Sequence, residues 1–270
     1  MSARAALAWL PRALLLGLLA FFIFGPLFNM LLWAFAERWY FPHRLPLEFG
    51  FDFWARVFAP RSQALQSLAT SVWIASLTVL LCTALALPAG YALARLSLPL
   101  RSLIMLLFLL PQAFPNLPVY INIARMFYTV GLNGTVLGVV LVHTVHGLVY
   151  AVWITTAAFA AVDRELEEAA RNMGASRLRT FWTVSLPLAA PGILASAIFV
   201  FLESLDEFTG TYFVGVPDVT TLPLLMFTAS MGGNYQIASI TALILLVPSL
   251  LFMLVIERFL RADVLAKVGT

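Results

Sequence analysis

The chain has 270 residues, of which 62% are hydrophobic and 11% are charged, and its mean hydropathy is +0.95. Soluble domains are about 45–50% apolar and about 25% charged, so this composition excludes an ordinary soluble fold and indicates a protein that folds in a lipid bilayer. The net charge is +3 and no run of like charges occurs, so the sequence does not predict a nucleic-acid-binding surface.

Six apolar stretches are long enough to cross the hydrocarbon core as helices, which predicts an all-α membrane protein with six transmembrane helices. In chain order they are 13–35, 67–94, 102–124, 134–160, 188–212 and 236–260. Apolar residues run through each stretch without alternation, which excludes the strands of a transmembrane barrel. The first stretch resembles a signal peptide because Ala34-Phe35-Ala36 is typical of a cleavage site. A signal core has only about 7–15 apolar residues, however, so we interpret the stretch as a retained first span.

Basic residues near the ends of the spans predict the orientation of the chain in the membrane. Eleven of them lie on the side that carries both termini, namely Arg4, Arg12, Arg95, Arg101, Arg164, Arg171, Arg177, Arg179, Arg258, Arg261 and Lys267. The opposite side has Arg38, Arg44, Arg56, Arg61 and Arg125. This asymmetry predicts that both termini are cytoplasmic. Segment 37–66 is expected to be a partly ordered external loop with a short helix near Phe51–Phe58.

The third predicted span is interrupted by three prolines between Pro111 and Pro118. Proline removes a backbone donor and kinks a helix, so this segment is expected to be irregular. Three nearby polar residues, Gln112, Asn116 and Tyr120, are candidates for the lining of a translocation path. A kink that packs against neighbouring helices is the alternative interpretation.

The second and fourth spans carry the residue types that most often bind metals. Cys82 is the one cysteine of the chain and lies in an apolar run, where we expect it to pack as a small core residue. His143 and His146 are three residues apart on the fourth span. With no carboxylate or thiol on the same helix, they are expected to pack in the bundle, form hydrogen bonds or line a pore. The sequence predicts no metal site and no catalytic residue.

Residues 161–187, AVDRELEEAARNMGASRLRTFWTVSLP, hold the densest charge of the chain. Asp163 is expected to cap a helix with acids in its first turn and Arg171 near its end, as the helix dipole favours. Glu167 and Arg171 are four residues apart, which allows their side chains to pair. Gly174 suits the left-handed residue that ends a helix. The pattern predicts an amphipathic helix on the cytoplasmic face.

A second short helix is expected after Gly174, capped by Ser176 and ending before Pro187.

Three acidic residues, Glu203, Asp206 and Glu207, lie in the fifth predicted span. Spacings of three and four residues place Glu203 on one helix face with the other two. Ionisable groups at this depth face the bundle interior or a water-filled path. They either line a path for a cationic substrate or hold a partner or a gate through hydrogen bonds and salt bridges.

The order Glu168-Ala169-Ala170, three residues, Gly174, nine residues, Val184, one residue, Leu186-Pro187 resembles the EAA loop of binding-protein-dependent ABC importer permeases. The family pattern is E-A-A-x3-G-x9-I-x-L-P, and the single departure is Val184 for Ile. The runs 203–208 (ESLDEF) and 215–224 (GVPDVTTLPL) are similar to the same family, the second to its polyamine-type branch. The resemblance covers roughly residues 67–260.

The resemblance implies a type I ABC importer permease fold with a cytoplasmic coupling helix at about 164–174. It implies an N-terminal tail and first span at 1–36, an external loop at 37–66, a permease core at 67–260 with the EAA loop at 161–187, and a cytoplasmic tail at 261–270. The positions that would couple to the ATPase are Glu167, Glu168, Ala169, Ala170, Arg171, Gly174, Leu186 and Pro187.

The partners implied by the resemblance are a second permease subunit (identical or different), two ATP-binding subunits and an external substrate-binding protein, in a bacterial inner membrane. No G-x-x-x-x-G-K-[ST] phosphate loop occurs, so ATP is expected to be used by the partner and no cofactor by this chain. A small cation such as a polyamine is the expected substrate; an aminophosphonate, thiamine and ferric iron remain open.

Two other functional classes remain as alternatives. A secondary transporter driven by an ion gradient would use the buried acids as proton or sodium sites, but such proteins have internal repeats that are not evident here. A membrane-embedded enzyme would need a matched nucleophile and base or a set of metal ligands, and the sequence contains neither.

Overall fold

The fold is known from a computed structural model, which describes residues 3–40 and 42–268, with side chains described for 12–40 and 42–254. The chain divides into two compact units. Unit 1 is Met1–Ala64 with Met226–Leu243, and unit 2 is Leu65–Leu225 with Ile244–Thr270. The basic side chains of Arg4, Arg258, Arg261 and Lys267, used above to predict orientation, lie outside the described side chains.

Unit 1 contains helix α1 (Ala3–Phe35), strands β1 (Ala36–Arg38) and β2 (Glu48–Phe49), and helix α2 (Asp52–Phe58). The strands form an antiparallel hairpin in which Arg38 faces Glu48, and the two side chains form an exposed ion pair at 2.9 Å. The helix predicted near residues 51–58 is confirmed, whereas the hairpin was not predicted. Strands of three and two residues are too short to produce an alternating pattern.

The regular secondary structure of unit 2 consists of helices alone within its described residues. Its elements are α3 (Ala64–Arg95), α4 (Arg101–Phe108), α5 (Leu110–Ala113), α6 (Asn116–Val130), α7 (Val136–Ala160), α8 (Arg164–Asn172), α9 (Arg177–Thr180), the π-helical turn η1 (Phe181–Ser185), α10 (Leu186–Asp206) and α11 (Thr209–Val214). The residues of α12 (Leu222–Met231) and α13 (Tyr235–Val268) are divided between the two units.

Five helices in the described part of the chain are long and apolar enough to cross a membrane. They are Arg12–Phe35, Ala64–Arg95, Val136–Ala160, Arg177–Asp206 and Tyr235–Leu254. They correspond to the first, second, fourth, fifth and sixth predicted spans, so the expectation of six transmembrane helices is confirmed for five and not for the third.

The third predicted span, 102–124, is divided among α4, α5 and α6. Phe114, which precedes Pro115, has φ −94° and ψ 146°, because the proline ring clashes with a helical conformation of the preceding residue. Pro111 lies in the first turn of α5, where its missing N–H costs no hydrogen bond. The predicted irregularity between Pro111 and Pro118 is therefore confirmed, and it breaks the span rather than kinking it.

The helix that begins after Ser176 was predicted to end before Pro187. This prediction is wrong, because the helix continues through η1 into α10. Pro187 occupies the first turn of α10, and the π-helical turn in front of it accommodates the lost donor. At its other end α10 stops at Asp206 rather than near residue 212, because Glu207 is extended, with φ −74° and ψ 113°.

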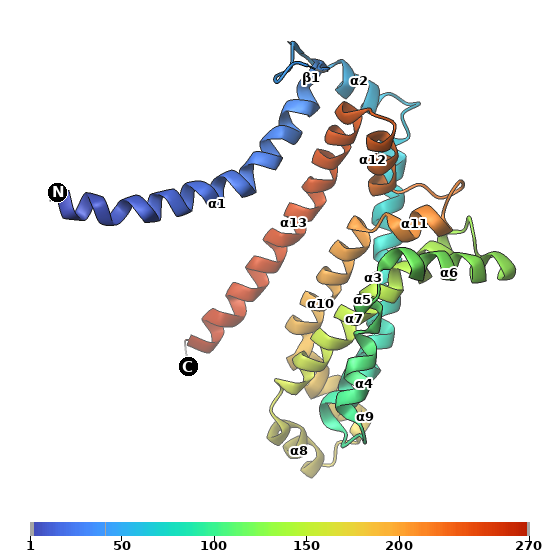
Figure 1. Cartoon of the computed structure of the whole chain (residues 1–270). Helices are drawn as coiled ribbons and strands as arrows, with labels where there is room; N and C mark the ends of the chain where they lie inside the picture. The colour runs from blue at the N-terminus through green and yellow to red at the C-terminus, as the bar shows by residue number, and fades with distance from the viewer. Residues whose placement is uncertain (1–2, 41, 269–270) are drawn as a thin grey trace. The chain divides into compact units, whose positions relative to one another are not determined.

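Close contact between α7 and α10 organises unit 2 (Figure 1). A Cβ atom at Gly192 on α10 would lie 2.5 Å from the Cβ of Ala158 on α7. A Cβ atom at Gly147 on α7 would lie 3.1 Å from Val200 of α10 and 3.2 Å from the sulfur of Cys82 on α3. Small residues let transmembrane helices approach closely. Cys82 is fully buried among them, which confirms its predicted role in packing.

Candidate functional site

Helix α8 is built by the local signals expected from the sequence. The Asp163 side chain accepts a hydrogen bond from the Glu165 backbone N–H at 2.9 Å and caps the first turn. Gly174 has φ +91° and no atom near its missing Cβ, so it provides the left-handed turn after the helix. The Ser176 hydroxyl accepts from the Arg179 N–H at 3.3 Å and caps α9. These three predictions are confirmed.

The Glu167 side chain points into the protein and is 3% exposed. Its Oε1 atom lies 2.9 Å from Nε of Arg95, at the end of α3, and accepts a hydrogen bond from the Ser185 hydroxyl of η1 at 2.8 Å. Arg171 instead donates from Nε to the Glu167 backbone carbonyl at 3.3 Å. The expected side-chain pair between Glu167 and Arg171 is therefore wrong, because a buried carboxylate pairs with the guanidinium that is buried beside it.

We call Arg95, Glu167 and Ser185 the α3–α8 junction. Arg95 also donates from its second terminal nitrogen to the carbonyl of Val162, at 2.7 Å, just before α8. Arg164 donates in return to the carbonyl of Ala94 on α3, at 3.3 Å. Hydrogen bonds from arginine side chains to a carboxylate and to backbone carbonyls thus connect α8 to α3. The bond from Ser185 connects α8 to the start of α10.

The opposite face of α8 is exposed and carries apolar side chains. Leu166 is 49% exposed and Met173 is 84% exposed, with exposed Ala169 between them. Glu168 is also exposed, whereas Ala170 is 8% exposed and faces inward. Leu166 and Met173 were not predicted as site residues, although their spacing with Ala169 is that of a helix face and could have revealed them. Arg95 and Ser185 were not predicted either, because no local pattern connects them to α8.

The other predicted coupling positions lie at the beginning of α10. Leu186 packs in a cluster with Phe159 and Ala189, and Pro187 is exposed. Neither residue belongs to α8, but both follow directly on Ser185 of the junction. The first part of the motif, in α8, and the last part, at the start of α10, are therefore joined by the hydrogen bond between Glu167 and Ser185.

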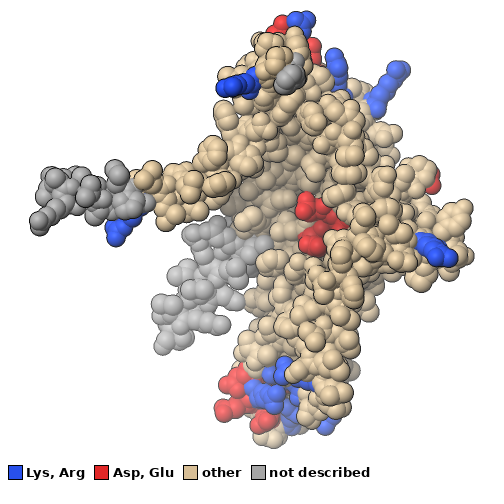
Figure 2. All heavy atoms as spheres, viewed as in Figure 1, with Lys and Arg blue, Asp and Glu red and all other residues tan. Residues whose placement is uncertain are grey.

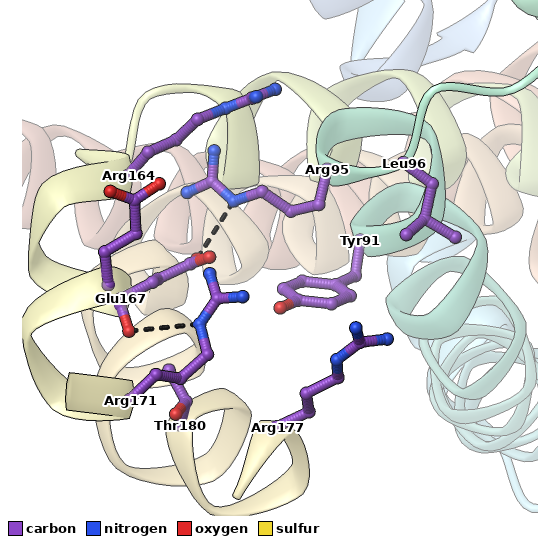
Figure 3. A pocket seen from close by; sticks show the side chains of 9 residues that line it. Tyr91, Arg95, Leu96, Arg164, Glu167, Arg171, Arg177 and Thr180 are labelled. Atoms are coloured by element: carbon purple, nitrogen blue, oxygen red, sulfur yellow. Dashed lines mark hydrogen bonds and ion pairs between the residues drawn. The ribbon is translucent and has the colours of Figure 1, made fainter. Parts of the chain in front are cut away.

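A pocket of about 250 Å³ opens beside the junction. Its lining comes from α3, α8 and α9, and consists of Tyr91, Arg95, Leu96, Arg164, Glu167, Glu168, Arg171, Arg177 and Thr180. Figure 3 shows Arg95, Arg171 and Arg177 around the same space as the Tyr91 ring. Basic and acidic side chains gather around α8 and α9, at the lower end of the view in Figure 2. Six of the nine lining residues are charged, so the pocket is strongly polar.

A second polar group joins α6, α7, α10 and α11 inside unit 2. The Tyr120 hydroxyl donates to Oε2 of Glu207 at 2.8 Å and lies 2.8 Å from Nδ1 of His146. A phenol has one proton, so when Tyr120 donates to Glu207 it accepts from the Nδ1–H of His146. The remaining ring nitrogen of His146 lies 3.1 Å from the Asn116 side chain. Glu207 also accepts from the Gly210 N–H at 2.7 Å and caps α11.

His143 is buried beside this network and lies 2.7 Å from the Ser204 hydroxyl and 2.8 Å from the Thr211 hydroxyl. Both histidines therefore pack in the bundle and form hydrogen bonds, as expected. Among the residues that the structure describes, no group of three His, Cys, Asp or Glu side chains could hold a metal ion.

The predicted path residues are only partly brought together. Tyr120, Asn116 and Glu207 share the network, whereas Gln112 is exposed on α5. Glu203 is half-buried and Asp206 is exposed, and within the described residues neither carboxylate has a hydrogen-bond or ion-pair partner. Glu203 and Asp206 thus lie outside the hydrogen-bond network that Glu207 joins.

Residues 86–262 match a family described as "Binding-protein-dependent transport system inner membrane component". The chain is 33% identical over 205 residues to the "Putative ABC transporter permease protein ORF1" of Streptomyces antibioticus, which covers 75% of this chain and 88% of that protein. It is 29% identical to the "Osmoprotective compounds uptake permease protein GgtD" of Synechocystis, and this match covers 74% of this chain and 69% of that protein. It is 30% identical to the "Putrescine transport system permease protein PotI" of Escherichia coli K12, with half of each chain covered.

The fold is also that of solved permeases. The chain matches a bacterial alginate ABC transporter, solved with an alginate pentasaccharide-bound periplasmic protein, at a TM-score of 0.70 and 16% identity. The match covers 94% of this chain and 95% of that one. The relatives do not favour the polyamine branch over permeases for other solutes. Family membership excludes the ion-gradient transporter and the membrane-embedded enzyme considered above.

The family match covers more than half of the chain, including α8 and the motif that follows it. Members of this family bind no cofactor, and a partner ATPase hydrolyses ATP. The chain therefore belongs to the binding-protein-dependent transport system inner membrane components, as a multi-pass, non-catalytic permease subunit of an ABC importer.

Proposed function

We propose that α8 is the coupling helix through which a separate ATPase acts on this permease. The observation that carries the proposal is the two-sided character of α8. Glu167 on one face is buried in the α3–α8 junction, whereas Leu166 and Met173 on another face are exposed. Exposed apolar side chains on a highly charged helix favour a protein interface.

The contact positions are Leu166, Glu168, Ala169 and Met173, with Gly174 as the turn that orients them. Glu167, which directly precedes the motif, and Ala170, which belongs to it, act from inside by holding α8 in place. Leu186 and Pro187 act by starting α10 directly behind the junction. A push on α8 reaches α3 through Arg95 and α10 through Ser185, so two membrane-spanning helices move with it.

We further propose that Glu203 and Asp206 meet the substrate, with Gln112 nearby on the path, and that the substrate is a small cation such as a polyamine. Unpaired carboxylates on a membrane-spanning helix support a path for positive charge. Asn116, Tyr120 and Glu207 support the path by fixing α6 and α11 against α7. An aminophosphonate, thiamine, ferric iron and the osmoprotectant named for one relative are the competing substrates.

The complete importer would contain this chain, a second permease that is identical or different, two ATP-binding subunits and an external substrate-binding protein. We place it in a bacterial inner membrane with both termini in the cytoplasm. The abundance of arginine around α8 and α9 supports this orientation, because basic residues are retained on the cytoplasmic side.

The coupling role is tested with the reconstituted complex in liposomes. Met173→Asp and Glu168→Lys are compared with Leu45→Asp, a control that places the same charge at a 65% exposed leucine far along the chain from α8. We expect the α8 variants to insert normally and to lose about tenfold or more of substrate-stimulated ATP hydrolysis, because central contacts dominate an interface. Unchanged hydrolysis in both α8 variants would exclude α8 as the coupling helix.

The substrate class is tested in the same liposomes with putrescine and with uncharged osmoprotectants. Glu203→Gln and Asp206→Asn are expected to raise the putrescine concentration that gives half-maximal stimulation of ATP hydrolysis. If only an uncharged solute stimulates hydrolysis, and both variants respond to it as the wild type does, the cationic substrate is wrong while the coupling helix stands.

A further inference from the structure

The pocket beside the α3–α8 junction carries more positive than negative charge. Four arginines and two glutamates line it. One of those glutamates, Glu167, is already bound by Arg95 and Ser185 inside the protein. The other, Glu168, is exposed at the rim and has no partner among the described residues.

The arginines of the pocket retain unused hydrogen-bond donors. Arg164 and Arg171 each make a single bond, to the backbone carbonyls of Ala94 and Glu167 respectively. Arg177 is exposed and has no hydrogen-bond or ion-pair partner within the described chain. A guanidinium presents five N–H groups, so the pocket offers several donors to one additional anion.

The pocket and the proposed contact face share a helix. Arg164, Glu168 and Arg171 of α8 line the pocket, whereas Leu166, Ala169 and Met173 lie on the opposite side of the helix axis. Glu168 belongs to both surfaces, because it lines the pocket and is a proposed contact position. A protein that contacts Glu168 therefore reaches the pocket rim and displaces water from it. Removing guanidinium groups from water without an ionic partner is costly, so that protein must supply negative charge at this point.

We propose that the pocket receives the carboxylate of an aspartate or glutamate side chain of the ATPase subunit. The inference rests on the proposed docking of the ATPase on α8 and adds the chemistry of one contact. A carboxylate fits because its two oxygens match the planar fork of an arginine, and a side chain of the partner fills the pocket as the surfaces meet. Arg177, whose guanidinium makes no hydrogen bond within the described chain, is the principal contact, and Arg171 is the second.

The test measures the affinity of the purified ATPase subunits for the permease pair in nanodiscs, at low and at high salt. The variants are Arg177→Gln and Arg177→Glu, and Arg171→Gln provides a second position. The matched control is Arg179→Gln, since Arg179 lies two residues away on α9 and does not line the pocket. Thermal stability of each permease variant checks that it folds.

We expect Arg177→Glu to weaken ATPase binding by about tenfold or more and to make the affinity less dependent on salt, whereas the control stays within about twofold of wild type. Replacing the partner carboxylate with lysine is expected to restore binding to Arg177→Glu while weakening binding to the wild type. Screening the acidic residues of the ATPase face in this way identifies that carboxylate.

Two outcomes overturn the inference and leave the coupling helix intact. One is a loss of binding in Met173→Asp but in none of the three variants at Arg171 and Arg177. The other is binding of inorganic phosphate to the wild-type permease that Arg177→Gln abolishes without any change in ATPase affinity, which would assign the pocket to a phosphate group. Binding that survives Met173→Asp, Glu168→Lys and the arginine variants alike would overturn the coupling helix together with the inference.

Discussion

The carboxylate of Glu167 joins three segments that are far apart in the chain. It bonds to Arg95, 72 residues earlier, and to Ser185, 18 residues later. The side chains of Arg95 and Glu167 are only 7% and 3% exposed, so each charge depends on the other for its solvation. The exposed pair Arg38–Glu48, with the same 2.9 Å separation, has no such dependence because water solvates both groups.

We predict that Glu167→Ala lowers the free energy of unfolding by about 3–5 kcal/mol, because it leaves the buried Arg95 charge without a partner. Glu48→Ala is the matched control and is expected to change stability by about 1 kcal/mol or less. Denaturation of the detergent-solubilised protein measures both.

The double variant Arg95→Met with Glu167→Leu extends this test. It is expected to be more stable than Glu167→Ala, because apolar side chains in place of a buried pair leave no unpaired charge. A double variant that is less stable than the single one would mean that Arg95 contributes mainly through its bond to the Val162 carbonyl.

At the scale of elements, glycines and prolines decide which helices can approach and where they stop. Gly192 permits α10 to touch α7 at Ala158, and Pro115 forces Phe114 to be extended and separates α5 from α6. The break between α10 and α11 at Glu207 places the Glu207 carboxylate opposite Tyr120. The polar network thus depends on an interrupted helix.

We predict that Gly192→Ala destabilises the protein by about 1–3 kcal/mol, because the new Cβ would lie 2.5 Å from that of Ala158 and would push the helices apart. Gly17→Ala, at a helical position with no atom within 4 Å of the added Cβ, is expected to be neutral or slightly stabilising. Adding Ala158→Gly is expected to recover part of the loss. The midpoint of thermal unfolding is the measurement, and equal midpoints for the two glycine variants would contradict the prediction.

Much of the local structure could be predicted from the sequence. The caps at Asp163 and Ser176 and the left-handed Gly174 were predicted because each depends on residues within a few positions of one another. Five of the six predicted spans are long apolar helices in the structure, and they could be predicted for the same reason. The partner of Glu167 was not, since a contact across 72 residues leaves no periodic pattern in the chain.

For the whole molecule, the proposed orientation of unit 2 in the membrane has the largest consequence for function. The proposed orientation places α8, the pocket and the arginines around them on the cytoplasmic side, where an ATPase can reach them. The loop that follows α6 would then be external. Both assignments follow from the distribution of basic residues and are open to direct measurement.

Labelling of single cysteines in intact spheroplasts tests this orientation. The native Cys82 is fully buried, so it is expected to react little with a charged maleimide. Tyr128→Cys, at a 78% exposed site on α6, should react from outside, whereas Met173→Cys, at an 84% exposed site beside α8, should react only after permeabilisation. The reverse pattern would place α8 outside and exclude its contact with a cytoplasmic ATPase.

The sequence by itself determined the membrane class, five of the six predicted spans, the position and caps of α8, and the likeness to the permease family. These properties depend on composition, on helical periodicity and on short spacings, all of which are local. The tertiary structure decided that Glu167 is buried against Arg95, that Tyr120 connects His146 with Glu207, and that arginines of three helices line one pocket. Those arrangements depend on which helices pack together, and therefore on the close approach of side chains that the linear sequence keeps far apart.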